Sequence, residues 1–365
     1  MSGRDGMRWR MLDTGLRRAA ENLALNQALL GAHAEHGTSH TLRFLRFYPC
    51  ALVGFHQDIG QEIREDYCRE QGVEIQRRLT GGGAIYFDET ALGWELYLDK
   101  KTLGTGDMAA ISARICEAAA NGIRRLGVDA RYRPRNDIEV DGRKISGTGG
   151  SFDGDAILFQ GTLLIDFDVE HMLRVLRVPA EKLSDKAIAS AQDRVANLKS
   201  LLGYEPSLET VQSSLAAGFA EAFGIDLEPA EQLEQVEVEG FREALAEIDT
   251  PEWVYQRDRP AASAPLREGF HRAAGGLIRA AVLVDESRDR LKQLWLTGDF
   301  FVHPRRMVAD LEAALRDTRL SELEANVHAF FDRYPVEMLM LGRDDFVQAI
   351  RAALAESGPD QMTAT

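Results

Sequence analysis

The sequence predicts an α+β protein with a mixed, mainly antiparallel β-sheet, packed helices and a smaller α/β domain at its C-terminal end. Short apolar runs separated by turn residues indicate strands, and helical patterns interrupt them without the regular alternation of a parallel sheet. The chain has 365 residues, of which 45% are hydrophobic, and this length exceeds what one compact core accommodates. Three prolines between residues 251 and 266 predict a linker, which separates a domain over residues 1–250 from one over 267–365.

The first half of the chain predicts two helices and five strands. Residues 17–30 place Leu23 and Leu29 on one helical face, with Glu21 and Asn26 on the other, and so predict an amphipathic helix. A second helix is predicted to begin at the capping residue Asp107 and to end before Gly127. The predicted strands cover residues 41–48, 51–55, 73–78, 84–87 and 94–99.

The second half predicts a hairpin in each domain. Residues 129–134, 137–150 and 157–166 alternate as strands, and the first two join at a sheet edge. The Asp141-Gly142 step favours a type I′ turn, because both central residues of that turn need a positive φ. Residues 276–285 and 290–301 predict another hairpin. The predicted helices of this half cover residues 208–223, 305–315, 320–331 and 344–354.

Charge and composition exclude several classes of protein. The formal net charge is −15 and the isoelectric point is about 5.1, which argues against a general nucleic-acid binder because such proteins need a basic face. No stretch approaches the roughly 18 consecutive apolar residues of a membrane span, and the start lacks the apolar segment of a signal peptide. The three cysteines are far apart and odd in number, which indicates a reducing compartment. We therefore expect a cytoplasmic protein.

The histidines His33, His36 and His40 have the only metal-like spacing in the sequence. They lie in a polar stretch between a predicted helix and a predicted strand, without the HExxH order that places two imidazoles on one helix face. We predict a solvated loop here and no metal site.

The segment RRLTGGGAIYFD, residues 77–88, is the most informative part of the sequence. Its three consecutive glycines have no Cβ, so backbone N–H groups can approach a ligand and form an anion-binding concavity. Arg77 and Arg78 precede them and add donors suited to phosphate or carboxylate. The order is neither that of a P-loop nor that of a dinucleotide-binding loop. The segment predicts a phosphate or nucleotide loop, with a plain glycine-rich hairpin as the alternative.

A second glycine-rich segment contains a lysine on a predicted strand. Small residues follow Lys144, so its ammonium could point into a cleft and stabilise developing negative charge, with Asp137 orienting it. The alternative is an exposed edge-strand lysine that prevents aggregation.

Two further segments carry polar residues in unusual positions. Gln160-Gly161-Thr162 interrupts an apolar strand, and polar groups inside a buried strand need partners, of which a ligand is one. Lys182 and Lys186 then precede Arg194. Taken alone, this basic run indicates a solvated helix face.

These four segments, in this order and spacing, resemble the lipoate-protein ligase A family. The matching stretches are RRLTGGGAIYFD, NDIEVDGRKISGTGG, FQGTLL and KAIASAQDRVANL, supported by WRMLDTG and AENLALNQALL near the start. Together they cover residues 7–203. The distal part is similar to the small accessory domain that some of these ligases carry at the C-terminus. The resemblance implies the fold of the biotin/lipoate protein ligase superfamily.

The resemblance also implies an activity. Family members join lipoate to ATP, release pyrophosphate, and pass the lipoyl group from lipoyl-AMP to a lysine of a lipoyl carrier protein. We therefore expect an ATP-dependent, AMP-forming ligase that uses ATP and Mg²⁺, accepts lipoate or octanoate, and binds neither nucleic acid nor membrane.

The family's functional residues have counterparts in this sequence. Lys144 corresponds to the lysine that touches the acyl carbonyl and the adenylate phosphate. Asp137 corresponds to the carboxylate that orients or deprotonates the carrier lysine. The residues expected to bind substrate or the adenylate are Arg78, Thr80, Gly81, Gly82, Gly83, Ala84, Asn136, Ser146, Gly147, Gln160, Gly161 and Thr162.

Two positions depart from the family pattern. Phe87 and Gln160 stand where histidines are usual, which removes imidazole donors from the expected pocket and adds apolar surface. These differences are compatible with a specialised carrier, such as that of bacterial sulfur oxidation.

Other activities remain open. One alternative is an octanoyl or lipoyl transferase that works through a cysteine thioester, although the NDI and glycine segments contain no cysteine. Another is a non-catalytic lipoyl-binding homologue. Biotin ligation is disfavoured because the sequence lacks the GRGRxGR-like loop of biotin ligases.

Overall fold

The structure, a computed structural model, describes residues 9–105, 107–134, 136–177, 191–258 and 266–355. Contacts along the chain divide it into two units. The larger unit consists of Met1–Leu52, Ile63–Leu79 and Ile85–Val254, and the smaller unit consists of Val53–Glu62, Thr80–Ala84 and Tyr255–Thr365. The domain boundaries drawn from the sequence stay a prediction, because the smaller unit also takes in two short segments from the first quarter of the chain.

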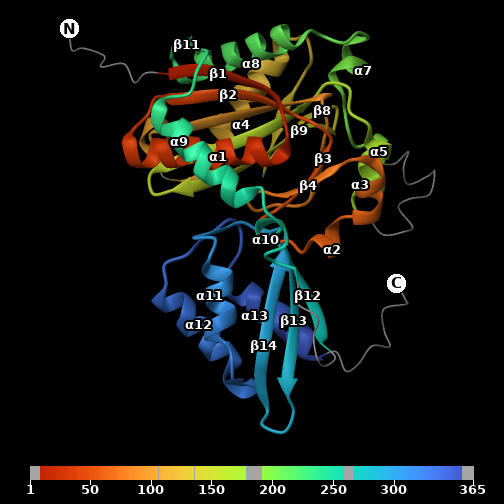
Figure 1. Ribbon diagram of the computed structural model, residues 1–365, viewed down its shortest axis with the longest axis vertical. Helices are drawn as coiled ribbons and strands as arrows, with labels where there is room; N and C mark the ends of the chain where they lie inside the picture. The colour runs from red at the N-terminus through yellow and green to blue at the C-terminus, as the bar shows by residue number, and fades with distance from the viewer. Residues whose placement is uncertain (1–8, 106, 135, 178–190, 259–265, 356–365) are drawn as a thin grey trace. The chain divides into compact units, whose positions relative to one another are not determined.

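The larger unit is built on an eight-stranded sheet of order β11-β1-β2-β6-β10-β9-β8-β7 (Figure 1). Its strands are β1 (Trp9–Arg17), β2 (His40–Phe47), β6 (Ala91–Asp99), β7 (Arg131–Arg133), β8 (Asp137–Val140), β9 (Arg143–Asp153), β10 (Ala156–Leu164) and β11 (Leu227–Ala230). The pairs β11/β1 and β1/β2 are parallel, and every other pair in this sheet is antiparallel. This confirms the predicted mixed, mainly antiparallel sheet. Strands β1 and β11 were not predicted from the sequence.

A second, three-stranded sheet of order β4-β3-β5 lies in the same part of the chain. Its strands are β3 (Cys50–Val53), β4 (Glu74–Arg77) and β5 (Ile85–Phe87). The helices of the larger unit are α1 (Ala19–His36), α3 (Glu65–Gln71), η1 (Lys100–Leu103), α4 (Met108–Arg124), α5 (Val169–Val175), α7 (Leu198–Leu202), α8 (Leu208–Phe223), α9 (Gln235–Ile248) and α10 (Pro251–Val254). Helix α10 occupies the start of the predicted linker, and residues 259–265 lie outside the described part of the chain.

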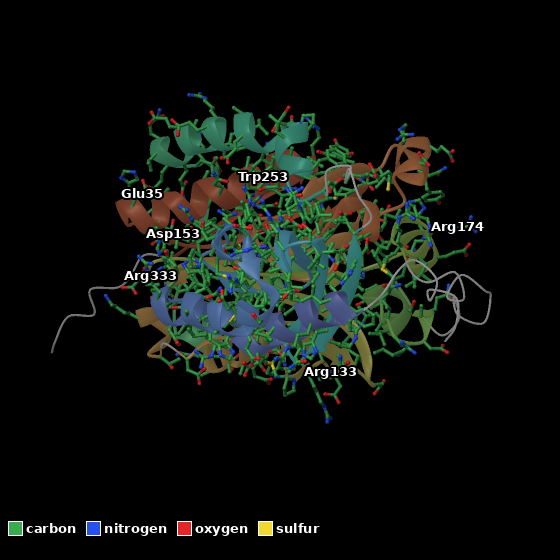
Figure 2. The ribbon with its side chains drawn as sticks, turned by 90° about the horizontal axis from the view of Figure 1, so that it is seen from below. Glu35, Arg133, Asp153, Arg174, Trp253 and Arg333 are labelled. Carbon is green, nitrogen blue, oxygen red and sulfur yellow. The ribbon has the colours of Figure 1, made fainter. Side chains whose placement is uncertain are left out.

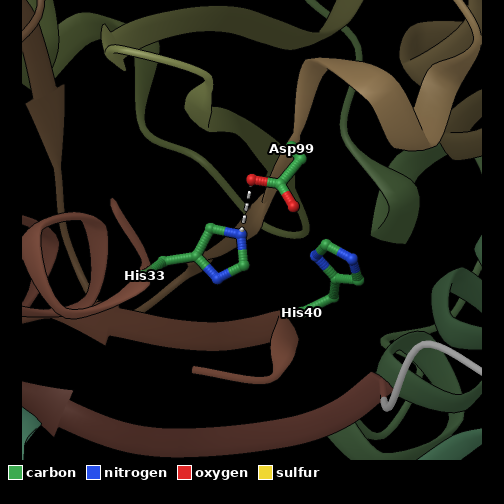
Figure 3. A group of neighbouring side chains, drawn as sticks. All are labelled: His33, His40 and Asp99. Atoms are coloured by element: carbon green, nitrogen blue, oxygen red, sulfur yellow. Dashed lines mark ion pairs between the residues drawn. The ribbon is translucent and has the colours of Figure 1, made fainter. Parts of the chain in front are cut away.

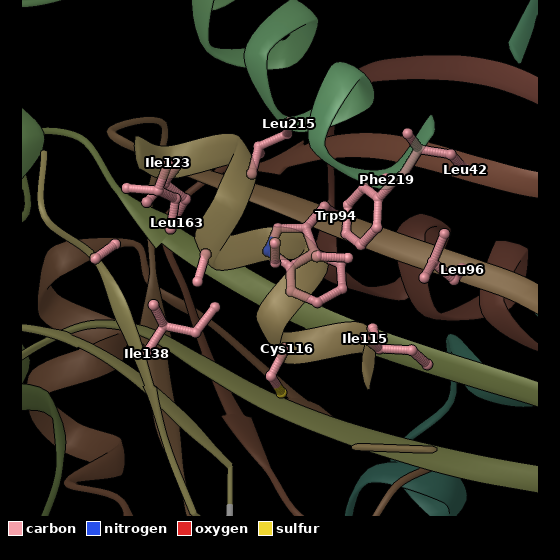
Figure 4. Packing of buried hydrophobic residues seen from close by; sticks show 14 of the residues in the cluster. Leu42, Trp94, Leu96, Ile115, Cys116, Ile123, Ile138, Leu163, Leu215 and Phe219 are labelled. Carbon is pink, nitrogen blue, oxygen red and sulfur yellow. The ribbon is translucent and has the colours of Figure 1, made fainter. Parts of the chain in front are cut away.

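Helices cover both faces of the large sheet because its strands alternate between two apolar faces. On one face, Trp94 of β6 packs with Ile115 of α4 and Phe219 of α8 (Figure 4). On the other face, α1 contacts Tyr97 and Leu158, and it lies beside α9. The sheet is therefore the middle layer of three.

Helix α1 confirms the first predicted helix but not its amphipathic character. Asn26, expected on the polar side, is 2% exposed and donates to Glu95 Oε1 over 2.7 Å. Glu95 also binds Arg43 over 2.9 Å, and Arg43 binds Asn22 Oδ1 over 2.6 Å. Since α9 covers one side and the sheet the other, α1 buries polar residues that pair with buried charges of the sheet.

Two local predictions are confirmed by backbone geometry. Asp141 and Gly142 have φ of 51° and 73°, as a type I′ turn requires, and they join β8 to β9. Asp107 caps α4 by accepting a hydrogen bond from the N–H of Ala109 over 2.9 Å. Helix α8 has the bounds predicted from the sequence.

The smaller unit has its own sheet, of order β12-β13-β14-β16, and its own core. Its strands are β12 (Arg267–Ala273), β13 (Gly276–Asp285), β14 (Arg290–Gly298), β15 (Val302–His303), β16 (Thr318–Arg319) and β17 (Glu337–Met338). Its helices are α2 (Ile59–Glu62), α11 (Met307–Ala314), η3 (Leu320–Glu322), α12 (Leu323–Arg333) and α13 (Arg343–Ala355). The predicted hairpin β13–β14 and the three predicted helices of this region are confirmed. None of the helices among the described residues is both long and apolar enough to cross a membrane.

Candidate functional site

The β8–β9 hairpin brings the two predicted catalytic residues together. Lys144 Nζ lies 2.7 Å from Asp137 Oδ1. The Lys144 side chain is 43% exposed, whereas that of Asp137 is 14% exposed. A half-exposed ammonium held by a largely buried carboxylate can meet a negatively charged ligand without first losing its orientation.

Asp137 has a second cationic partner, Arg133, whose pairing with this carboxylate was not predicted from the sequence. Arg133 of β7 binds Asp137 Oδ2 over 2.7 Å and Glu139 Oε1 over 2.9 Å. Its side chain lies at the surface (Figure 2). The β7–β8 register places Arg133 opposite Asp137, so the predicted pairing of these two strands could have revealed it.

Gly147 provides room for the Lys144 side chain. A Cβ at residue 147 would lie 2.8 Å from Lys144 Nζ and 2.9 Å from its Cε. The Gly147 N–H donates to Thr162 Oγ1 over 3.1 Å. Two predicted ligand residues, Gly147 and Thr162, therefore belong to the same small cluster as the lysine.

Asn136 and Ser146 differ in their hydrogen bonding. Asn136 Nδ2 donates to the Thr148 carbonyl over 3.2 Å, and the Asn136 carbonyl accepts from the Thr148 N–H over 2.8 Å. These bonds give Asn136 a role in joining the start of β8 to β9. Ser146 is fully buried, and its Oγ has no hydrogen-bond partner among the residues that the structure describes.

The segment KAIASAQDRVANL contacts Lys144 through backbone hydrogen bonds. The Lys144 N–H donates to the Arg194 carbonyl over 2.8 Å, and the Lys144 carbonyl accepts from the Ala196 N–H over 2.8 Å. Residues 194–196 thus fix the main chain of Lys144 from outside the hairpin. Lys182 and Lys186 lie outside the described residues.

The Gln160-Gly161-Thr162 stretch lies on β10, and its residues face different ways. A Cβ at Gly161 would lie 2.1 Å from the Trp94 ring, so glycine there is required by packing. Gln160 is half-buried and pairs with Glu95 across the sheet. A ligand role for Gln160 and Gly161 stays a prediction.

The arginines before the glycine loop are buried rather than displayed at the surface. Arg78 is 6% exposed and donates to the Leu52 carbonyl over 2.9 Å. Its burial lowers the pKa of the guanidinium to about 10, which still leaves it charged near neutral pH. Arg77 is fully buried and donates to the Val254 carbonyl over 2.9 Å.

The glycine loop, Thr80–Ala84, is grouped with the smaller unit. A Cβ at Gly81 would lie 2.2 Å from the Phe300 carbonyl oxygen, and a Cβ at Gly54 would lie 2.0 Å from the Gly82 carbonyl oxygen. Gly82 has a φ of 92°, and Gly83 is exposed. Close backbone contacts therefore account for two glycines in this region, whereas the ligand roles of Thr80, Gly81, Gly82, Gly83 and Ala84 stay predictions.

Phe87 packs in the core of the larger unit. It is 6% exposed and its ring centroid lies 4.8 Å from that of Phe47. The expectation that it adds apolar surface to a ligand pocket stays a prediction.

All three cysteines are buried. Cys116 Sγ of α4 lies 3.4 Å from Thr148 Oγ1 of β9. Burial raises the pKa of the Cys116 and Cys68 thiols to about 11, and raises that of Cys50 well above its ordinary value. None of these thiols resembles a reactive thiolate, which needs exposure and positive surroundings.

The histidine stretch is not the solvated loop that was predicted. His33 and His40 are each 5% exposed, and only His36 of the three is exposed. His33 ends up in the last turn of α1 and His40 begins β2. Burial, reinforced by His33 and opposed by Asp99, lowers the pKa of His40 to about 4.

Known proteins show the same fold and similar sequences. Residues 18–220 match the family described as the lipoyl protein ligase A/B catalytic domain. Octanoyltransferase LipM of Kyrpidia tusciae is 30% identical over 273 residues, which cover 68% of this chain and 99% of that protein.

Two solved structures carry the comparison into three dimensions. An archaeal bi-partite lipoate protein ligase from Thermoplasma acidophilum, described with its E2 lipoyl domain, has a TM-score of 0.63 and 28% identity. It covers 70% of this chain and 100% of its own. A lipoate-protein ligase A bound with ATP has a TM-score of 0.60 and 26% identity over 68% of this chain and 99% of its own. Because the family match spans more than half of the sequence, this chain belongs to the lipoyl protein ligase A/B catalytic-domain family.

Proposed function

We propose that this protein is an ATP-dependent lipoate-protein ligase, which joins lipoate to AMP and then transfers the lipoyl group to a lysine of a carrier domain. The observation that supports it most is the contact of Lys144 Nζ with Asp137 Oδ1 at 2.7 Å. That contact leaves a half-exposed, oriented ammonium in a family whose relatives include a lipoate ligase bound with ATP.

The first step needs positive charge at the reacting phosphorus. The lipoate carboxylate attacks the α-phosphorus of ATP, forms the acyl-phosphate bond and displaces pyrophosphate. Negative groups approach one another in this step, so a fixed cation lowers its barrier. Lys144 supplies that cation, and Asp137 holds it in place. Arg78 is the second cation that the resemblance assigns to the adenylate.

The second step needs a neutral amine. The carrier lysine attacks the acyl carbon, an amide bond forms and AMP leaves. The amine must lose a proton, and a nearby carboxylate such as Asp137 can accept or relay it. Both oxygens of Asp137 have cationic partners. The contacts of Asp137 therefore support a role in positioning Lys144, whereas its role in proton transfer rests on the family resemblance.

Mg²⁺ would shield the phosphates of ATP during the first step. The described residues around Lys144 include no cluster of three metal ligands. We expect Mg²⁺ to arrive with the nucleotide, because Mg²⁺ in such sites is held mainly by phosphates and water.

A second candidate function is octanoyl transfer between carriers, favoured by the 30% identity with Octanoyltransferase LipM. A transfer through a thioester needs a nucleophilic cysteine. The buried state of all three cysteines weighs against it. Cys116 contacts Thr148 of β9. A carrier-binding role for the smaller unit, as the accessory domain, follows from the resemblance only.

Intact-mass measurement of carrier domains distinguishes these functions. The full chain is incubated with lipoate, Mg-ATP and a panel of lipoyl carriers, including one of the kind used in sulfur oxidation. We expect lipoyl mass on a carrier and pyrophosphate release, both dependent on ATP. Transfer of octanoate from an octanoylated carrier without ATP would instead establish the transferase. Lipoate binding without any product would establish a non-catalytic homologue.

A further inference from the structure

His33, His40 and Asp99 meet at one end of the large sheet (Figure 3). His33 lies in the last turn of α1, His40 begins β2, and Asp99 ends β6. Gly37, with a φ of 63°, ends the helix and turns the chain back toward the sheet. One ligand atom from each of the three residues lies within 4.8 Å of the other two.

The hydrogen bond of His33 fixes which ring nitrogen faces Asp99. Nδ1 lies 2.8 Å from the Thr38 carbonyl oxygen. A carbonyl oxygen can only accept, so Nδ1 carries a proton and the neutral ring keeps its lone pair on Nε2. A histidine that donates one N–H to a backbone carbonyl and presents the other nitrogen is the usual arrangement of a metal ligand.

The Nε2 lone pair of His33 faces a carboxylate. Nε2 lies 3.4 Å from Asp99 Oδ1, is buried, and makes no hydrogen bond within the described residues. A buried nitrogen lone pair that faces a carboxylate oxygen is unfavourable unless a cation lies between them. This position therefore favours a bound cation.

His40 supplies a third donor on the same side. Its Nε2 lies 3.3 Å from Thr102 Oγ1, and Figure 3 shows its other ring nitrogen turned toward His33 and Asp99. The two imidazole centroids are 5.1 Å apart. The Asp99 side chain is 44% exposed. An ion can therefore reach the site from solvent, and the Asp99 carboxylate can adjust its position.

We propose that His33, His40 and Asp99 form a binding site for a divalent transition-metal ion, with Zn²⁺ as the preferred occupant. Two imidazoles and one carboxylate are ligands that Zn²⁺ accepts in a tetrahedral site whose fourth position holds water. Bonds of about 2.0–2.2 Å place the ligands of such a site roughly 3.4 Å apart. The three donors therefore have to close by little more than 1 Å at their widest separation.

The site lies apart from the lysine cluster along the sheet. Asp99 follows Gly93 by six residues along β6, which corresponds to about 20 Å, and Gly93 pairs with Thr162 of the lysine cluster. A metal ion here would tie the end of α1 to the ends of β2 and β6. It would stabilise the larger unit without contacting the residues proposed for ligation.

The test is metal binding by the full chain without a histidine tag. After incubation with Zn²⁺ and dialysis, we expect one zinc per chain by mass spectrometry and a rise in Tm, since a ligand that binds only the folded state stabilises it. Asp99→Asn and His33→Gln should each weaken Zn²⁺ affinity at least tenfold. His36→Gln is the matched control, because His36 is the exposed histidine of the same stretch, and it should bind like the wild type.

Co²⁺ provides a spectroscopic measurement that starts from the wild type. Replacement of Zn²⁺ by Co²⁺ in the wild type should give the strong visible absorption of a four-coordinate site, and Asp99→Asn should lose it. Failure of the wild type to retain zinc, or equal zinc affinity in Asp99→Asn and His36→Gln, would overturn the proposal.

Discussion

The ammonium of Lys144 lies directly against the backbone of Gly147. A Cβ at residue 147 would be 2.8 Å from Nζ, a separation that real Cβ atoms do not adopt. Gly147→Ala should therefore push the ammonium away from Asp137 while leaving the β8–β9 pairing intact. A shift of about 1 Å in a catalytic group can cost about 100-fold in rate, so we expect adenylate formation to fall by roughly that factor, measured as pyrophosphate release.

Gly31→Ala is the matched control for this substitution. A Cβ at Gly31, in the middle of α1, has no neighbour within 4 Å. Alanine should keep full activity and raise the free energy of unfolding by up to about 1 kcal/mol, because it favours helix. Equal activity of the two alanine variants would show that the position of Lys144 is not critical.

Removal of the ammonium itself should have a larger effect. Lys144→Ala should reduce adenylate formation by about 100-fold to 1,000-fold, the usual cost of losing one group that stabilises transition-state charge. The fold should survive, since this side chain is 43% exposed. Pyrophosphate release and thermal unfolding measure the two effects separately. Lys101→Ala, which removes an exposed lysine paired with Asp155 at 3.2 Å, should leave both unchanged.

The elements that the sequence predicted well are those set by neighbouring residues. The Asp141-Gly142 turn joins β8 to β9, and the register of this hairpin places Asp137 opposite Gly147 and Lys144 opposite Glu139. Asp137 and Lys144 therefore lie close together on one hairpin. Helix α1 was predicted less well because periodicity counts apolar residues only. Asn22 and Asn26 are buried through hydrogen bonds with Arg43 and Glu95, and nothing in the helix itself indicates those partners.

The parts of the site that escaped prediction depend on contacts far apart in the sequence. His33 and His40 lie beside Asp99, which is 59 residues beyond His40 in the sequence. The composition of the glycine loop predicts a ligand-binding loop. In the structure, the space beside Gly81 is taken by the carbonyl of Phe300. A local pattern shows that glycine is needed, but it does not show whether a ligand or a backbone segment takes the space.

The buried Arg43–Glu95 pair predicts a strong effect on stability. Arg43 is fully buried and binds Glu95 Oε2 over 2.9 Å. Arg43→Leu leaves the carboxylate buried without its cation, so the free energy of unfolding should fall by about 3–5 kcal/mol in urea titrations. The exposed pair of Arg125 and Glu221, at 2.5 Å, is the control. Arg125→Leu should cost less than about 1 kcal/mol, and similar losses in both variants would contradict the argument.

Thiol reactivity separates the ligase from a thioester-forming transferase. With a pKa of about 11 for Cys68 and Cys116, only about one thiol in a thousand is ionised at pH 8, and the thiolate is the reactive form. Alkylation of the folded protein by iodoacetamide should therefore be slow at pH 8 and rise about tenfold per pH unit toward pH 11. Burial keeps these thiols neutral in the folded state, whereas the thiols of the unfolded chain begin to ionise near pH 9. The contribution of these thiols to the free energy of unfolding is therefore present below pH 9 and declines above it.

The urea-unfolded chain is the reference for the alkylation experiment, and cysteine variants connect the result to function. The chain in urea should react at the rate of free cysteine, which shows that burial and not the reagent limits the folded protein. Replacement of all three cysteines by alanine should leave ATP-dependent lipoylation largely intact. A thiol that reacts rapidly at pH 8 in the folded chain, together with loss of acyl transfer in the matching variant, would favour the transferase. Cys116 is the first cysteine to test in this way, because its Sγ lies 3.4 Å from Thr148 Oγ1 on the strand that carries Lys144.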